Sequence, residues 1–431
     1  MNIFKFINEG NKTYFYLFGF CIYYKRKDLF ENYTRFLCFR FRKNLNQNAI
    51  KLENIEHKVD LILQALQNSG NTKFQEKIQK NSHSTIDNID VFLKGIRPKT
   101  VLLIESNNYH AEVLPSIARY FINLGFNVDI FLSYKEYISE PFALFKYKKI
   151  NIYYADNSTI LSCLTNKRIN KYEYIYFNSE NVNYGKSNSV EFYKIQSVNK
   201  NKLLYMVHHP NSWNYSDEVK TLMLGDFNFK GNKKPASIIP TFFGHINIQP
   251  KNKITHFVVV GNIQKERKNF DLLIKTVEKV LEEGFRDFVV DVIARVGELQ
   301  IPESLKSIIQ FHGSLSYPKM YELVRKSDFI LTLMDIRIEE HHRYINEGFS
   351  GSILLSYGFR KPCLIEEPFS YKYELDKKNS IIYNGEENFQ KAFKNAITAT
   401  DIEYLKIQTN LSETVNKLYL QSLTNLQKTL N

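Results

Sequence analysis

The feature that most constrains the fold of this chain is a regular alternation of short apolar runs with helical patterns between residues 101 and 383. The first unit is an apolar run at 101–104, a polar turn, a helical pattern closed by Gly125, and a second apolar run at 127–132. Such a strand, helix and strand joined by short loops predict parallel strands with a right-handed crossover. Further strands are predicted at 150–154, 174–177, 203–207, 221–224 and 237–239, which together indicate a doubly wound sheet.

The same alternation resumes near residue 256. An apolar run ends at Gly261, and a basic turn that contains Arg267 and Lys268 precedes a predicted helix from Asn269 to about residue 283. Strands at 288–294, 308–311, 329–333, 363–365 and 381–383, with helices at 318–326 and 352–358, predict a second parallel sheet. The chain from residue 387 is predicted to be helical nearly to its end, with an apolar stripe able to pack across both domains.

The chain has 431 residues, which is long for one domain and sufficient for two. We predict an N-terminal extension over residues 1–95, a first doubly wound domain over 96–250 and a second over 251–431. Two such domains form a cleft between them, and the basic turn of the second domain would face it. The predicted cleft suits a nucleotide-linked substrate.

Lysine and arginine number 58 against 45 acidic residues, a net charge of +13, which favours anionic partners. Much of the excess lies in the first fifty residues, among many phenylalanines. Two interpretations of this segment stay open: association with an anionic membrane surface, or packing against another subunit or the main body. Nucleic acid is disfavoured because no recognised binding motif is present. Residues 46–67 predict an amphipathic helix and 68–88 a linker, so the extension is expected to be helical.

Four scattered cysteines show no metal-ligand spacing, and no cleavable signal pattern opens the chain. The apolar run at 14–24 has about half the length that a bilayer span needs. We therefore expect a cytoplasmic protein, with a peripheral position on the inner face of the membrane as the location that the basic, aromatic N-terminus suggests.

A small-residue turn, Ser350, Gly351 and Ser352, stands at the start of one predicted helix. Ser350 is the expected N-cap. The first amides of a helix lack internal partners and carry partial positive charge, so a phosphate can dock there if no large side chain intervenes. An ordinary capped helix before a core strand is the alternative interpretation.

Histidines occupy two of the loops that follow strands of the first predicted sheet. His110 lies in the loop 105–112, and His208 and His209 follow the strand at 203–207. Because ligands of such sheets bind at the carboxyl ends of the strands, these histidines are candidate site residues. Loop histidines bonded to the backbone are the alternative.

Three runs in the second half carry a family resemblance: VVVGNIQKERKNFDLLIKTV, FHGSLSYPKMYELVRKSDFILTLMD and EGFSGSILLSYGFRKPCLI. In order and approximate spacing they resemble the donor-binding half of the group 1 glycosyltransferases, which have the GT-B fold. The resemblance is good over about residues 255–385, weaker over 100–250 and absent from the first 95. It implies two Rossmann-like domains and retaining transfer of a sugar from a nucleotide-sugar donor to a glycan or lipid-linked acceptor. No cofactor is expected beyond the nucleotide-sugar substrate, and no metal, since an Asp-x-Asp triplet is absent from the sequence.

The resemblance also implies roles for individual residues. Gly261 and Lys268 match the family's diphosphate-binding glycine and lysine, with Arg267 beside them, and this turn would neutralise the leaving diphosphate. The arginine that often follows the glycine is replaced by Asn262. Arg343 lies outside the common pattern and is our candidate for a second phosphate clamp, with an ion pair to a neighbouring glutamate as the alternative.

Two glutamates eight positions apart usually flank the small-residue turn of the family. The first, near the transferred sugar, matches Glu347, whereas the second falls on Leu355, so Ser356 becomes the candidate for ribose. His208 or His209 resembles the family's acceptor-side histidine. If the reaction inverts instead, His110 or Glu112 is the first candidate for the base.

The missing second glutamate supports a rival interpretation, a non-catalytic GT-B-like partner that holds a glycan-assembly complex at the membrane. Glu347 and the diphosphate-binding features oppose it, because a scaffold needs none of them. A nucleotide-sugar epimerase or a sugar phosphorylase is disfavoured, since the expected catalytic carboxylates and pyridoxal-binding pattern are absent from the sequence.

Overall fold

The structure is a computed structural model. It describes residues 4–9, 12–17, 20–27, 32–36, 86, 88–145, 147, 149–179, 197–210, 219–229, 233–294 and 301–431, the first four ranges as backbone only. The chain separates into two compact units, Met1–Ser82 and His83–Asn431, and each is described by itself.

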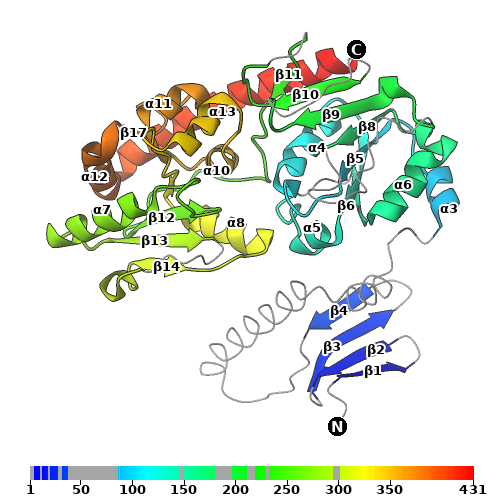
Figure 1. The fold of residues 1–431 in the computed structure, drawn as a ribbon, viewed down its shortest axis with the longest axis horizontal. Helices are drawn as coiled ribbons and strands as arrows, with labels where there is room; N and C mark the ends of the chain where they lie inside the picture. Colours follow the sequence, from blue (N-terminus) through cyan, green and yellow to red (C-terminus); the bar gives the residue numbers. More distant parts are fainter. Residues whose placement is uncertain are drawn as a thin grey trace. The chain divides into compact units, whose positions relative to one another are not determined.

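The first unit contains a four-stranded antiparallel sheet (Figure 1). Its strands follow chain order: β1 (Phe4–Glu9), β2 (Lys12–Leu17), β3 (Phe20–Lys27) and β4 (Asn32–Phe36). These strands are not among the elements predicted from the sequence, where the first fifty residues are described only as a basic, aromatic segment and the helix of the extension is placed at 46–67. The reason is that aromatic residues were interpreted as a surface for headgroups, although runs such as KTYFYL favour strands. The predicted helix at 46–67 lies outside the described residues.

The second unit begins its first sheet at β5, and the predicted doubly wound sheet is confirmed. Seven parallel strands stand in the order β11-β10-β9-β8-β5-β6-β7. They are β5 (Thr100–Glu105), β6 (Asn127–Leu132), β7 (Ile150–Tyr154), β8 (Tyr174–Phe177), β9 (Leu203–Val207), β10 (Lys220–Leu224) and β11 (Ala236–Ile238).

Helices cover this sheet on both faces (Figure 1). They are α3 (Ile89–Lys94), α4 (Leu114–Asn123), α5 (Tyr134–Ser139) and α6 (Asn157–Thr165), with short 3-10 turns at Ala111–Val113, Lys167–Lys171 and Lys200–Lys202. Val101 and Leu103 pack into the core on the α4 side, and Leu102 and Ile104 into the core on the α6 side. Alternate strand residues thus enter opposite cores, which is why the strand reads as one continuous apolar run.

The second sheet has six parallel strands in the order β14-β13-β12-β15-β16-β17, as predicted. They are β12 (Thr255–Val260), β13 (Phe288–Ile293), β14 (Ile309–Phe311), β15 (Phe329–Leu331), β16 (Cys363–Glu366) and β17 (Ile381–Tyr383).

The helices of this half alternate with its strands. They are α7 (Phe270–Glu282), α8 (Tyr317–Lys326), α9 (Arg343–Asn346), α10 (Gly351–Phe359), α11 (Glu367–Ser370) and α12 (Gly385–Thr398). The 3-10 turns are Glu303–Leu305, Glu339–His342 and Tyr371–Tyr373. Asn269 caps α7 by accepting the Leu272 N–H at 3.1 Å, at the start predicted from the sequence.

The C-terminal helix α13 (Asp401–Leu430) joins the two halves of this unit. A capping box formed by Thr400 and Glu403 starts it, so the single predicted helix is interrupted after α12. Its first half packs Leu411 into the core around α10, and its last turns pack Leu426 beside β10 and β11. Figure 1 shows the helix running from the α10 side to β10 and β11. The prediction that its apolar stripe packs across both domains is confirmed. Among the described residues, no helix is long and apolar enough to cross a bilayer.

Candidate functional site

A glycine at the end of β12 opens the predicted phosphate site. Gly261 has a φ of +102°, and its N–H donates to the carbonyl of Ile293 at 2.9 Å. This left-handed backbone conformation favours glycine. A Cβ built on Gly261 would meet nothing within 4 Å, so the space beside this backbone is open.

Lys268, at the end of the basic turn, is the buried cation of the site. Only 6% of its surface is exposed, and its ammonium donates to the carbonyl of Thr332 at 3.1 Å and to the hydroxyl of Ser352 at 3.0 Å. Burial lowers the pKa of Lys268 to about 8, and no carboxylate of the described residues offsets this effect. A bound anion would therefore supply the charge compensation that this lysine lacks.

The start of α10 lies at this lysine. Ser350 occupies the N-cap position, as predicted, without a capping hydrogen bond from its side chain. Gly351 is exposed, and a Cβ there would again find open space within 4 Å. Since Ser352 in the first turn accepts the Lys268 ammonium, the helix N-terminus and the lysine converge on one place.

A cavity of about 530 Å³ adjoins the basic turn. Three of the site residues predicted from the sequence, Arg267, Arg343 and Glu347, line this cavity. Lys268 and the Ser350 turn are not part of its wall. Its lining is Glu266, Arg267, Glu339, Glu340, Arg343, Asn346 and Glu347. The two arginines are the cationic groups of a wall that also contains four glutamates and Asn346.

Loops from the two sheets meet beside this cavity. A Cβ on Gly348 would lie 3.5 Å from Nε of Arg343 and 3.7 Å from Cε1 of His209, so both side chains pack against this glycine. Burial lowers the pKa of His209, and the Arg343 charge adds to this effect against opposition from Glu347. The structure thus brings together three predicted residues, His209, Arg343 and Glu347.

The sequence left open which histidine of the pair approaches the second domain. His209 does, whereas His208 is buried and its Nε2 lies 2.6 Å from the carbonyl of Asn178. Burial, with a contribution from His110, lowers the pKa of His208 well below its usual range, so the ring is neutral. His208 is therefore hydrogen-bonded to the backbone, which is the alternative interpretation given for the loop histidines.

His110 stacks on His208, with ring centroids 4.4 Å apart. Its φ of +72° is uncommon for a residue with a side chain and presents the ring toward Glu112, 3.6 Å away. Burial opposes protonation of His110, but Glu112 and two further glutamates outweigh it and raise the pKa. His110 and Glu112, the pair named for a base, are thus in contact.

Three participants of this region were missed by the sequence analysis: Glu105, Glu136 and Tyr317. Burial raises the pKa of both glutamates to about 7. The Tyr317 hydroxyl lies 3.2 Å from a carboxylate oxygen of Glu112 and 3.0 Å from one of Glu136, so α8 of one half contacts the other. Glu105 ends a strand and could have been found from that position, whereas no local signal marks the other two.

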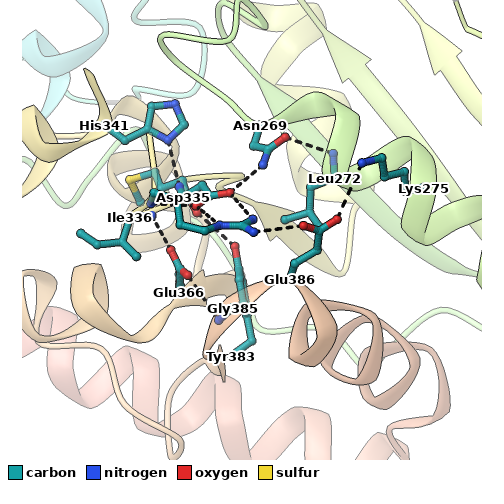
Figure 2. Close-up of polar contacts among 12 residues, drawn as sticks. Asn269, Leu272, Lys275, Asp335, Ile336, His341, Glu366, Tyr383, Gly385 and Glu386 are labelled. Atoms are coloured by element: carbon teal, nitrogen blue, oxygen red, sulfur yellow. Dashed lines mark hydrogen bonds and ion pairs between the residues drawn. The ribbon is translucent and has the colours of Figure 1, made fainter. Parts of the chain in front are cut away.

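An acidic network holds the loop after β15 (Figure 2). Asp335 accepts from Asn269 at 2.6 Å and from Arg337 at 2.7 Å. Glu366 accepts the backbone N–H of Ile336 at 2.7 Å. This network, which was not predicted from the sequence, fixes the loop at the carboxyl edge of the second sheet.

Ser356, the residue expected at the ribose, is fully buried. Its hydroxyl donates to the carbonyl of Lys361 at 2.7 Å, within the turn that ends α10. In this conformation the hydroxyl serves the helix terminus, so the structure lends the ribose assignment no support and it stays a prediction.

Comparison with known proteins gives structural matches only. No family model matches the sequence, and no curated protein does. A glycosyltransferase from Rickettsia africae ESF-5 matches with a TM-score of 0.51 and 14% identity, over 78% of this chain and 98% of that one. HepE from Anabaena, solved in complex with UDP, matches at 0.47 and 12%, over 77% and 99%. WaaG, a glycosyltransferase involved in lipopolysaccharide biosynthesis, matches at 0.42 and 10%, over 76% and 98%.

The match to the Rickettsia africae protein shows a shared fold. It extends over nearly all of that chain, and the two parallel sheets of seven and six strands agree with it. The predicted GT-B architecture is thereby confirmed for the second unit. At 14% identity the likeness extends to fold and not to substrate.

Proposed function

We propose that this protein is a glycosyltransferase that moves a sugar from a nucleotide diphosphate donor to a glycan or lipid-linked acceptor. The observation that carries the proposal is the buried ammonium of Lys268, held against Ser352 in the first turn of α10. A buried cation, a helix N-terminus and an open glycine after β12 form one anion-binding arrangement.

The donor diphosphate would lie between the basic turn and the start of α10. Lys268 and the α10 amides would neutralise one part of it, and Arg267 and Arg343 at the cavity wall another. Neutralising the leaving diphosphate lowers the barrier to breaking the sugar–phosphate bond, because charge develops on that oxygen in the transition state. The protein's cations fulfil this task in the scheme, which includes no metal.

The transferred sugar would lie beside Glu347 and His209. Both adjoin Arg343, so the sugar would be close to the diphosphate and to the loops of the first sheet at once. An acceptor hydroxyl could then reach it from the His110 side. Retention of configuration is carried into the proposal from the sequence resemblance. An assignment to glycan synthesis at the inner face of the membrane belongs to the same proposal.

A second candidate function rests on one observation. Leu355, at the position of the family's second glutamate, is 5% exposed and belongs to the core around α10. A chain with a buried leucine in place of the glutamate that binds the ribose in the family would be expected to bind the donor poorly. Such a chain fits a non-catalytic partner of a glycan-assembly complex.

Calorimetric titration with UDP-, GDP- and ADP-sugars separates these functions, with a CMP-sugar, which carries one phosphate, as the comparison. The transferase proposal expects micromolar binding of one of the three nucleoside diphosphate sugars and release of that nucleotide when an acceptor is supplied. A folded protein that binds none of the three would overturn it and favour the partner subunit.

A further inference from the structure

His341 lies in the loop after β15 and is fully enclosed, with 0% of its surface exposed. Its Nδ1 accepts the backbone N–H of Asp335 at 2.9 Å. Its Nε2 lies 2.9 Å from the carbonyl of Lys265, the first residue of the basic turn. One imidazole therefore bridges two loops at the carboxyl edge of the second sheet.

The partners of His341 determine its protonation state. A backbone N–H can only donate, so Nδ1 must offer its lone pair to Asp335. A carbonyl can only accept, so Nε2 must carry the proton that bonds Lys265. A single neutral tautomer satisfies both partners, whereas a proton on Nδ1 would face the Asp335 N–H and break that bond.

The other end of the basic turn is fastened to the same loop. The ammonium of Lys268 donates to Thr332, and Asn269 donates its backbone N–H to the carbonyl of Leu333 at 2.8 Å. Figure 2 shows Asn269 and His341 reaching Asp335 from different sides. The turn from Lys265 to Asn269 is thus held at both ends by residues 332–341.

The loop that holds the turn is itself rigidly anchored. Tyr383 donates to the carbonyl of Met334 at 3.2 Å, and Arg337 binds Glu386 at 3.1 Å (Figure 2). Glu366 accepts the Ile336 N–H, as described above. Displacing the loop at 332–341 would require several hydrogen bonds to break together, so the loop can hold the basic turn in one position.

We propose that His341, in its neutral Nε2–H form, is the positioning residue that sets the Lys265–Lys268 turn for binding of the donor diphosphate. This inference rests on the proposed function and adds a residue outside the three runs that carry the family resemblance. His341 does not touch the donor in this scheme. It acts through the carbonyl of Lys265, so that Arg267 and Lys268 meet the phosphates with little further ordering.

Two substitutions separate the two bonds of the ring. In His341→Gln the side-chain amide can reach the position of Nε2 and donate to Lys265. In His341→Asn the side-chain oxygen takes the position of Nδ1 and can accept from Asp335, but the bond to Lys265 is lost. His256→Asn is the matched control, because His256 is a half-buried histidine near the amino end of β12 in the same sheet.

The test measures dissociation constants of UDP, GDP, ADP and CDP by calorimetry for the wild type and these three variants, with thermal unfolding recorded for each. For the diphosphate that the wild type binds, we expect His341→Gln and His256→Asn to stay within about twofold of it. His341→Asn should bind about tenfold more weakly, as the loss of one positioning bond implies. Equal weakening in both His341 variants would reduce His341 to a structural role, and wild-type affinity in both would overturn the inference outright.

Hydrogen exchange of the wild-type protein keeps the inference testable if the His341 variants fail to fold. A bound diphosphate should slow exchange over residues 261–269 and over residues 334–342 together. Protection confined to the first segment would overturn the coupling. A wild type that binds none of the four diphosphates contradicts the proposed function instead, so the two failures are distinguishable.

Discussion

Replacement of Lys268 by methionine tests the proposed site most directly. Methionine keeps most of the side-chain volume but removes the charge and the donors. The 6% exposed lysine lies among Thr332, Ser352 and the start of α10. If the charge of Lys268 serves to bind an anion, Lys268→Met should lower the affinity for the donor without lowering the free energy of unfolding.

The structure sets the expected magnitude. A fall of the Lys268 pKa from 10.5 to about 8 corresponds to about 3 kcal/mol by which burial disfavours the charged form. Loss of the two hydrogen bonds acts in the opposite direction by about 1 kcal/mol each. Lys268→Met should therefore unfold with a free energy within about 2 kcal/mol of the wild type, and on the more stable side. Donor affinity should fall ~10- to 100-fold, since a charge-assisted contact with phosphate is lost.

The pH dependence of stability has a definite sign. The folded-state pKa of Lys268 is depressed, so the folded protein releases this proton at about pH 8 while the unfolded chain keeps it to 10.5. The burial penalty is fully present at pH 7 and disappears as the pH rises through this window. The net advantage of methionine, about 1 kcal/mol at pH 7, should therefore shrink above about pH 8, reach zero near pH 9 and reverse at higher pH, where only the loss of the two hydrogen bonds remains.

Lys361→Met is the matched control. Lys361 is 4% exposed, and burial lowers its pKa to about 8 as well. It precedes β16, at the amino edge of the sheet, whereas Lys268 lies at the carboxyl edge. The control should change the free energy of unfolding in the same direction but leave donor affinity as it is.

Urea unfolding and calorimetry with nucleotide-sugars measure the two quantities. A Lys268→Met protein that loses more than about 2 kcal/mol of stability and binds the donor like the wild type would refute the reasoning, because the lysine would then be a structural residue. Equal loss of donor affinity in Lys361→Met would refute it as well, since the effect would follow from burial of charge alone.

Three further predictions concern other parts of the molecule. Gly358→Ala places a Cβ 2.0 Å from a ring carbon of Phe243 and should lower the free energy of unfolding by about 2 kcal/mol. Gly351→Ala on the same helix meets open space and should weaken only donor binding. Equal stability of the two variants would contradict this expectation. Burial raises the pKa of Asp291, but two neighbouring histidines outweigh this effect and lower that pKa to about 2. The stability that the lowered pKa provides is present above pH 3.8 and is lost toward pH 2. In denaturant titrations, Asp291→Asn should therefore lower the free energy of unfolding by about 2 kcal/mol at pH 7 and leave it unchanged at pH 2. Glu347→Gln should bind the donor nucleotide with wild-type affinity, but its rate of sugar transfer, measured as nucleotide released in the presence of acceptor, should fall at least about tenfold. An unchanged rate of transfer would remove Glu347 from the proposed site.

Much of the second unit could be predicted from sequence because its elements are locally encoded. Parallel strands buried on both faces leave continuous apolar runs, and helix starts leave N-cap residues, such as Asn269, which caps α7, and Ser350, which occupies the N-cap position of α10. The strands between residues 4 and 36 were missed because their aromatic residues were assigned to a surface instead of a sheet. A single sequence pattern supported both interpretations there.

The sequence by itself determined where the phosphate-binding candidates lie, since Gly261, Lys268 and Ser350 follow from the order of strand, turn and helix. Only the tertiary structure decided what surrounds them. It buried Lys268, turned Ser356 into the core, and chose His209 over His208 as the histidine beside Arg343. The physical reason is that backbone hydrogen bonding and periodicity are local. Desolvation of a charge, and contact between loops of two sheets, depend on which distant surfaces the fold brings together.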